Sequence, residues 1–588
     1  MSKHFTILGN HRLTNDVARQ YRELGAVTPT TPLCPPEVGK VLRSAIPTTP
    51  LNSPEGGKVL RAATSPLRGD GGGYEGASYC LFYDDDQTAM AALHSLAESL
   101  QPPQGSMSAN CAQPPLPPPS IPPRGGSPDA QPLPPFGGTG GGVARPVCHL
   151  LLHSRTALRL AQTVGFDAAI TDRLDVYPFS LDDEWAGTIQ LDRKSVTAAS
   201  EQVVHLVVFG MGDTAETVAI RAALTAHYPN YVRNHSLRTR ITMVAPDARL
   251  QADRLIATYS HLFANSHYRI VVADEPRPVV LTHRPDCVAA GMDEFVDVEW
   301  EFVESTSHHP MLREKLQLWA LDTAHRQLTI VMAGDNAMQN VDRALSLPAA
   351  VSRMQVPVYV YMHDDSVLRH LSPSEGVVIP FGMTDRGFDV RRPLVQMARS
   401  INYIYNLCYR DNDIGWNGWL RYAPEIDRQA SIAQWQRVSP VKRMSNICNA
   451  MTVATKLRSV TLPSVPPKGG GSNAQPLPPF GETEGGVRGV WDIPQHDIEL
   501  LTQVEHNRWC VEELILGWRP CTAEERRLVE ADISQKEVLK QQCRAHYDLC
   551  SYRELAADAT GKPVAIYDLC LCSCLPLIAN SFNPDEPL

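Results

Sequence analysis

The sequence lacks any run of about 18 consecutive apolar residues, the length that a membrane-spanning helix requires. Its first residues, MSKHFTILGNHRL, also lack the basic region and apolar stretch of a secretory signal. A formal net charge of -10 and an isoelectric point near 6.0 leave no basic excess of the kind that nucleic-acid binding requires. We therefore expect a cytoplasmic protein that does not bind nucleic acid.

Motifs that mark common catalytic sites are absent as well. The chain contains no HExxH, no GxSxG, no GxxxxGK[ST] phosphate loop and no Tyr-x-x-x-Lys pair. None of the 19 histidines, among them His308, His309 and His363, lies in a pattern that assigns it an acid–base role. We therefore expect a non-catalytic protein, and an NAD-dependent oxidoreductase is the less favoured alternative.

The 14 cysteines include no CxxC pair. The densest group is Cys570, Cys572 and Cys574 in DLCLCSCLPLIA, where alternating thiols could bind a soft metal. Neither a histidine nor a fourth cysteine lies nearby to complete such a site, so we expect these thiols to be packed in a core and to bind no metal.

Three segments rich in proline and glycine interrupt the chain, at about 28–73, 101–146 and 461–489. Two of them contain the same octapeptide, AQPLPPFG, at 130–137 and 474–481. Such segments sustain neither helices nor strands and bury little apolar area, which predicts disordered loops inserted between structural elements. Polyproline ligands for SH3-like partners are the functional alternative.

The strongest ligand-binding pattern follows a predicted buried strand, VVHLVVF at 203–209. The next residues read GMGDTA and lead into a predicted helix over 216–228. In this GxGxxA pattern Gly210 permits a tight turn, Gly212 lets the backbone approach a pyrophosphate, and Ala215 allows close packing of helix and strand. Asp213 follows Gly212. Asp247, after a predicted strand at 240–244, is a candidate for binding ribose hydroxyls, although it lies further along than the roughly 20 residues typical of such sites.

A weaker version of this arrangement opens the chain. The apolar stretch HFTIL predicts a strand that turns at Gly9, and Asn10 and Arg12 precede a predicted helix. Helix amides and the guanidinium could bind an anion there, and a turn that binds nothing is the equally supported alternative. Strands predicted at 77–83 and 147–153 extend this first sheet, and strands at 328–333, 356–362 and 377–381 complete a second sheet that ends near residue 390.

The stretch HLVVFGMGDTAETVAIRAALTAHY resembles the NAD-binding domains (TrkA-N or RCK) that regulate bacterial potassium transport, and FTILGNHRLTNDVARQY resembles a divergent second copy. In that family nucleotide binding alters a dimeric sheet assembly that gates a channel. The resemblance implies an α/β chain with two Rossmann-like doubly wound parallel-sheet domains, at 1–195 and 196–392. It also implies a homo-oligomer and an NAD(H) or other adenine nucleotide cofactor at Gly210, Gly212 and Asp213, and more weakly at Gly9 and Asn10.

Helical patterns dominate the remainder and predict a connector at 393–460 and, after the insert at 461–489, a C-terminal module at 490–588. The stretch VEHNRWCVEELILGWRP at 504–520 predicts an amphipathic helix that ends at Gly517. Its EHNRW and GWR, together with HYDLCSYREL at 546–555, resemble the RyR domain, the repeat named after the ryanodine-receptor calcium channel. The longer connector at 523–544, and Cys550 where that family usually has valine, depart from the family pattern. The resemblance implies a small, mostly α-helical module for assembly or ligand recognition.

The polar residues of this module have two interpretations. His506 and Asn507 could fasten the helix to the loop of the second motif, which is the favoured one, or a cleft of Glu505, Asn507, Trp509 and Trp518 could bind a small ligand. Arg508 is spaced to form solvent-exposed ion pairs with Glu505 and Glu512. The full set of candidate interface residues is Glu505, His506, Asn507, Trp509, Trp518, His546 and Asp548.

These features lead to one functional hypothesis and one alternative. The hypothesis is a cytoplasmic regulatory protein that binds a nucleotide at the Gly210 turn and signals through the RyR-like module. The alternative is a soluble regulatory subunit of a membrane channel or transporter, because both resembled families are associated with channels.

Overall fold

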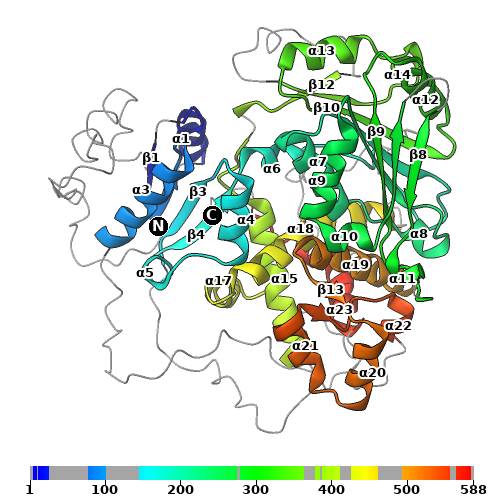
Figure 1. Cartoon of the computed structure of the whole chain (residues 1–588). Helices are drawn as coiled ribbons and strands as arrows, with labels where there is room; N and C mark the ends of the chain where they lie inside the picture. Colours follow the sequence, from blue (N-terminus) through cyan, green and yellow to red (C-terminus); the bar gives the residue numbers. More distant parts are fainter. Residues whose placement is uncertain are drawn as a thin grey trace, which may run out of the picture.

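The structure of the 588-residue chain is a computed structural model. It describes residues 4–9, 11–24, 77–100, 145–273, 278–289, 291–362, 378–384, 387–410, 426–460, 493–556 and 565–583. Asn10, His363 and the three proline- and glycine-rich segments, apart from Arg145 and Pro146, lie outside these residues. The described residues form two sheets made largely of parallel strands, together with helices, so the α/β prediction is confirmed (Figure 1).

The first sheet contains four parallel strands that lie in chain order. Their apolar residues are buried, as Leu81, Leu150 and Leu151 illustrate with exposures of 0%. Among the described strands of this sheet the order does not reverse. The elements are β1 (His4–Leu8), α1 (Leu13–Glu23), β2 (Ala77–Leu81), α3 (Asp86–Ser99), β3 (Val147–Leu151), α4 (Arg155–Thr163), α5 (Ala168–Thr171), β4 (Asp175–Phe179) and α6 (Leu181–Ala186).

The second sheet has the order β12-β11-β10-β5-β6-β9-β7-β8, and only the β7–β8 pair is antiparallel. From β5 the chain runs outward on one side and then returns to β10 on the other, so the strand order reverses between β5 and β10. Its strands are β5 (Val203–Phe209), β6 (Thr239–Ala245), β7 (His267–Val272), β8 (Val279–His283), β9 (Val298–Glu304), β10 (Arg326–Met332), β11 (Val358–Tyr361) and β12 (Val378–Phe381).

Helices cover both faces of this sheet. Side chains of β5 alternate between two cores: Leu206 and Val208 pack with residues of α7, whereas Val207 and Phe209 pack with residues of α12. The helices are α7 (Asp213–Thr225), α8 (Pro229–Arg233), α9 (Ala248–Thr258), α10 (Ser260–Ala264), α11 (Asp286–Ala289), α12 (Pro310–Leu321), α13 (Ala337–Leu345) and α14 (Ala349–Arg353).

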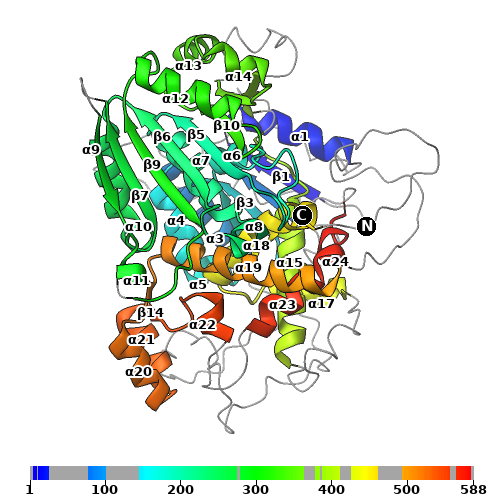
Figure 2. The ribbon, with the colours of Figure 1, turned by 90° about the vertical axis from the view of Figure 1, so that its right-hand side faces the viewer.

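The C-terminal helices pack onto this framework rather than away from it (Figure 2). Cys510, Val511 and Leu514 of α19 share a core with Val218 and Ala222 of α7, and α18 contacts both α4 and α7. No described helix has the length and apolar character needed to cross a membrane. The elements are α15 (Pro393–Arg410), α17 (Arg428–Trp435), α18 (Pro440–Ser459), α19 (Gln495–Ile515), β13 (Arg519–Pro520), α20 (Ala523–Ala531), α21 (Gln535–Cys543), β14 (Ala545–His546), α22 (Tyr552–Ala556), α23 (Ala565–Ser573) and α24 (Leu575–Ala579).

The cysteine group near the C-terminus is packed in a core, as predicted. Cys570, Cys572 and Cys574 are at most 5% exposed and lie in the apolar cluster formed by α15, α18, α19, α23 and α24. The hydrogen bond with Cys408, followed by burial, raises the pKa of Cys570, and burial raises the pKa of Cys572 and Cys574, so all three thiols are protonated at neutral pH.

Candidate functional site

The turn after β5 has the local structure that its glycines predict. Gly210 has a φ of +127°, and a Cβ there would lie 2.7 Å from the carbonyl oxygen of Ala333 after β10. The tight turn therefore requires glycine, because other residues rarely adopt this backbone conformation. Ala215 is 0% exposed within the core beneath α7, which confirms its packing role. Gly212 caps α7, and a Cβ on it would lie 2.8 Å from Asp335 Oδ1.

Carboxylates surround the N-terminal end of α7. Asp335 lies against Gly212, Asp213 is the first helical residue, and Asp182 of α6 accepts a hydrogen bond of 2.7 Å from Thr214 Oγ1. Burial raises the pKa of Asp182, and the Thr214 hydrogen bond opposes this shift. Negative groups are favoured at a helix N-terminus, so the protein itself already supplies the charge that an anionic ligand would bring.

Asp247 follows β6 at the same edge of the sheet and caps α9. It is exposed, and its Oδ2 accepts a hydrogen bond of 3.0 Å from Gln251 one turn further along the helix. The structure therefore gives Asp247 a contact within its own helix.

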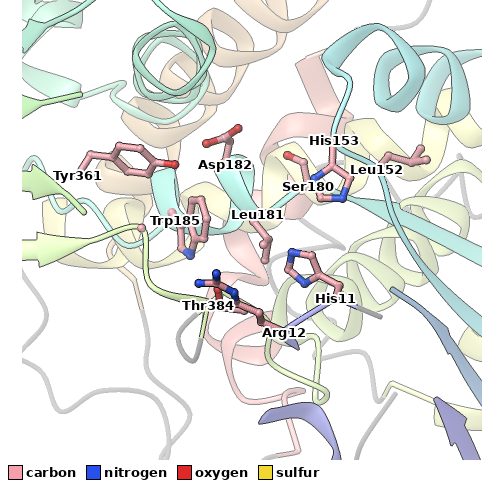
Figure 3. Close-up of a pocket in the computed structure, with 11 residues that line it drawn as sticks. His11, Arg12, Leu152, His153, Ser180, Leu181, Asp182, Trp185, Tyr361 and Thr384 are labelled. Carbon is pink, nitrogen blue, oxygen red and sulfur yellow. The ribbon is translucent and has the colours of Figure 1, made fainter. Parts of the chain in front are cut away.

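A cavity of about 490 Å³ lies where strands of both sheets end (Figure 3). The first sheet contributes residues that follow β1, β3 and β4, and the second contributes the end of β11 and residues that follow β12. Trp185 Nε1 donates a hydrogen bond of 3.0 Å to the carbonyl oxygen of Met383 and so joins the two walls. The lining residues are His11, Arg12, Leu152, His153, Ser180, Leu181, Asp182, Trp185, Tyr361, Gly382 and Thr384.

The polar groups of this cavity are divided by charge. Arg12 is exposed and makes no hydrogen bond or ion pair with the described residues, whereas Asp182 lies at the opposite end of the group in Figure 3. The rings of His11 and His153 approach one another, with centroids 5.6 Å apart. His153 Nε2 donates to the carbonyl oxygen of Tyr83 at 2.8 Å, and His11 Nδ1 accepts from the backbone N–H of Leu13 at 3.1 Å.

Of the candidate ligand residues near the N-terminus, the structure brings Arg12 to the cavity. Gly9, with a φ of +138°, instead closes the end of β1 against β2, and Asn10 lies outside the described residues. Apart from Arg12, none of the lining residues, among them His153 and Asp182, was predicted from the sequence. The position of these residues at strand ends was one available signal, because the carboxyl ends of parallel strands commonly form ligand sites. His153 ends one predicted strand, and Met362, next to Tyr361, ends another.

In the C-terminal module, Arg508 and its partners are fully buried, so the prediction of solvent-exposed ion pairs is wrong. Arg508 is 1% exposed, and Glu505 and Glu512 are 2% exposed. The Arg508 guanidinium donates to Glu505 at 2.9–3.0 Å and to Glu512 at 2.6 Å. Lys456 of α18 forms an ion pair with Glu505, to which Asn449 also donates at 2.8 Å. Lys456 and Asn449 of α18 cover these charged groups, whereas the prediction assumed that the groups face solvent. We call these five residues the buried ion cluster.

The other candidate residues of the module fill the interface between α19 and the following loop. His506 Nε2 donates to the carbonyl oxygen of Cys550 at 2.8 Å, which confirms the predicted fastening for His506. Asn507 is 6% exposed, and its side chain makes no hydrogen bond with the described residues. Asp548 is 0% exposed and forms an ion pair of 2.7 Å with Lys536.

Trp509 and Trp518 both contact the ring of His546 edge-on, at centroid distances of 5.0 and 6.1 Å. Glu505 instead bonds to Lys456 and Asn449 of α18. Trp509 and Trp518 therefore share His546 as a partner, whereas Glu505 has partners on another helix, and neither tryptophan lines the cavity between the sheets.

The buried ion cluster should make stability depend on pH in the acid range. Burial disfavours the Glu505 carboxylate, but the charges of Arg508 and Lys456 outweigh this and lower its pKa from 4.5 to about 2. A lowered folded-state pKa stabilises the protein above about pH 4.5, and this contribution is lost as the pH falls toward 2. Glu505→Gln should therefore lower the free energy of unfolding at pH 7 by about 2–3 kcal/mol and flatten its decline below pH 4.5.

Urea unfolding between pH 7 and pH 3 measures this difference. Glu499→Gln is the matched control, because Glu499 is an exposed residue of the same helix. Equal pH profiles for the two variants would show that Glu505 does not stabilise the fold through its charge.

A scan against protein-family models and searches of curated proteins and of solved structures found no match to this chain.

Proposed function

We propose that this is a non-catalytic regulatory protein that binds an adenine nucleotide, such as NAD(H), where the carboxyl ends of its two parallel sheets meet. The supporting observation is that strand ends of both sheets line one cavity of about 490 Å³. Ligands of parallel α/β proteins bind outside the carboxyl ends of the strands, and this volume lies within the usual range for small-molecule sites.

Strand order in the second sheet supports a Rossmann-like, TrkA-N-like domain. The order β9-β6-β5-β10-β11-β12 corresponds to 3-2-1-4-5-6 in chain order, and β7 and β8 extend one edge. The Gly210 turn follows β5, next to the position where the order reverses. Asp182 lines the cavity and accepts a hydrogen bond from Thr214 in the first turn of α7, so one lining residue contacts this turn, although Gly210, Gly212 and Asp213 do not line the cavity themselves.

The packing of α7 offers a route from the cavity to the RyR-like module. This helix contacts α6, which lines the cavity, and it also contacts α18 and α19. The buried ion cluster joins α18 to α19. A ligand that shifts α6 against α7 would therefore act on the contact between the connector and the module. Such a shift is the proposed regulatory signal.

We expect calorimetry and thermal unfolding of the full chain to detect saturable binding of at least one of NAD+, NADH, ATP, ADP and cyclic AMP. Asp182→Asn should weaken that binding about tenfold, because a carboxylate accepts hydroxyl hydrogen bonds more strongly than an amide does. Asp342→Asn, which removes an exposed carboxylate on α13, is the matched control and should leave binding unchanged. Failure of every nucleotide to bind would refute the proposed function.

A further inference from the structure

We infer that the phosphate of this ligand is bound at the end of the first sheet, by Arg12 together with His11 and His153, and not at the Gly210 turn. This inference rests on the proposed function and specifies the direction in which the nucleotide lies in the cavity. It reverses the direction that the GxGxxA pattern implies.

Charge at the Gly210 turn argues against a phosphate there. The turn contributes amides, but Oδ1 of Asp335 lies 2.8 Å from the position that a Cβ of Gly212 would take. Asp182 and Asp213 lie at the same helix end. A phosphate in this position would bring further negative charge next to these groups. Like charges at contact distance repel strongly, and partial burial increases the repulsion.

The opposite end of the cavity has the complementary chemistry. Arg12 is a guanidinium without a carboxylate partner among the described residues, and it immediately precedes the 11-residue helix α1. Guanidinium groups bind phosphate oxygens in pairs, and helix N-terminal amides favour negative charge. One wall of the cavity thus carries a cation without a carboxylate partner among the described residues, next to the start of α1, whose Leu13 N–H already donates to His11.

Two imidazoles line the cavity near this end, with the rings of His11 and His153 5.6 Å apart. Because His11 Nδ1 accepts the Leu13 N–H, the neutral ring carries its hydrogen on Nε2. His153 uses Nε2 to donate to Tyr83, so its Nδ1 remains for a ligand and becomes a donor when the ring is protonated. Asp182 Oδ2, at the other end, has no partner among the described residues and suits the hydroxyls of a ribose.

The test compares ligands that differ in phosphate and variants that differ in charge. Calorimetry on the full chain would measure the affinities of adenosine, AMP, ADP, NAD+ and inorganic pyrophosphate. Arg12→Gln should reduce the affinity for the phosphorylated ligands at least about tenfold and leave adenosine unchanged, since a charge-assisted contact is lost. Arg19→Gln, on the helix that follows Arg12 but paired with Asp16 at 3.2 Å, is the matched control and should change the affinity for neither kind of ligand.

The outcomes separate this inference from the proposed function. If the wild-type chain binds a nucleotide but Arg12→Gln binds it equally well, the inference is wrong while the proposed function stands. A loss of nucleotide affinity in Gly212→Ala but not in Arg12→Gln would place the phosphate at the Gly210 turn. If pyrophosphate binds and adenosine and the nucleotides do not, the cavity is an anion site and the nucleotide proposal fails. Absence of binding by every ligand would refute both.

Discussion

Arg508→Met is expected to lower the free energy of unfolding at pH 7 by about 3–5 kcal/mol, the usual effect of removing one partner from a buried ion pair. The substitution keeps a long side chain but leaves Glu505 with Lys456 as its remaining cation and deprives Glu512 of its guanidinium. Glu512 is 2% exposed, and its Oε1 already has no hydrogen-bond partner among the described residues. The cost arises from a carboxylate left charged in a site without water.

Arg553→Met is the matched control, because it removes the same side chain from an exposed pair. The Arg553 side chain is 82% exposed, and its contact with Asp293 is 2.5 Å long. Exposed pairs contribute about 0–1 kcal/mol, so this variant should unfold almost as the wild type does. Urea unfolding at pH 7 and pH 5 measures both, and the deficit of Arg508→Met should shrink at pH 5, as a buried lone carboxylate takes up a proton. A deficit of the same size in both variants would contradict the stabilising role of the buried ion cluster.

The sequence predicted the parts of the fold whose signal is local. Strands β5, β6, β10, β11 and β12 are apolar runs bounded by turn residues, and each lies within two residues of its predicted range. The Gly210 turn was predicted because glycine is required there by backbone geometry alone. These features need no knowledge of distant partners.

Strand β9, which reads VEWEFVE, was not predicted because three of its seven residues are charged. Glu301 within it is nevertheless 1% exposed, since Arg269 of β7 and Lys315 of α12 form ion pairs with it at 2.9 and 3.3 Å. The burial of Glu505 by Lys456 has the same origin. Partners from distant segments convert charged residues into interior ones, and a periodic pattern does not contain that information.

The candidate site likewise combines features that have a local sequence signal with features that depend on distant contacts. Arg12 and the Gly210 turn have local signals, but the cavity exists because the strand ends of two sheets face one another. That juxtaposition depends on α6 against α7 and on α18 against both α4 and α7, which are contacts between segments far apart in the chain. Asp182 becomes a candidate only when these contacts bring it beside Thr214.

Among the described glycines, Gly9 is the one where an added methyl group would meet the closest backbone atom, and we expect Gly9→Ala to prevent β1 from pairing with β2. With a φ of +138°, its Cβ would lie 1.7 Å from the carbonyl oxygen of Phe82 and 2.4 Å from the carbonyl carbon. Both are backbone atoms fixed by hydrogen bonds, from Phe82 N to Leu8 O at 2.8 Å and from His11 N to Phe82 O at 3.1 Å. The turn cannot relieve the overlap without separating β1 from β2, so a loss above about 4 kcal/mol is expected.

Gly291→Ala is the matched control, because it adds a methyl group at a positive φ without any steric overlap with the described residues and so measures the cost of backbone strain alone. Gly291 has a φ of +76°, and no atom of the described residues lies within 4 Å of the position that its Cβ would take. Its cost should be about 1 kcal/mol, that of a left-handed alanine. Hydrogen exchange of peptides covering 4–8 and 77–81 measures the effect, with those covering β5 and β6 as the internal reference. Full protection of the first two peptides in Gly9→Ala would contradict the geometry.

His11 and Arg12 follow the Gly9 turn directly and line the cavity. Loss of β1 should therefore also abolish phosphate-dependent ligand binding, so that the pairing of β1 with β2 and the binding of phosphate depend on the same turn.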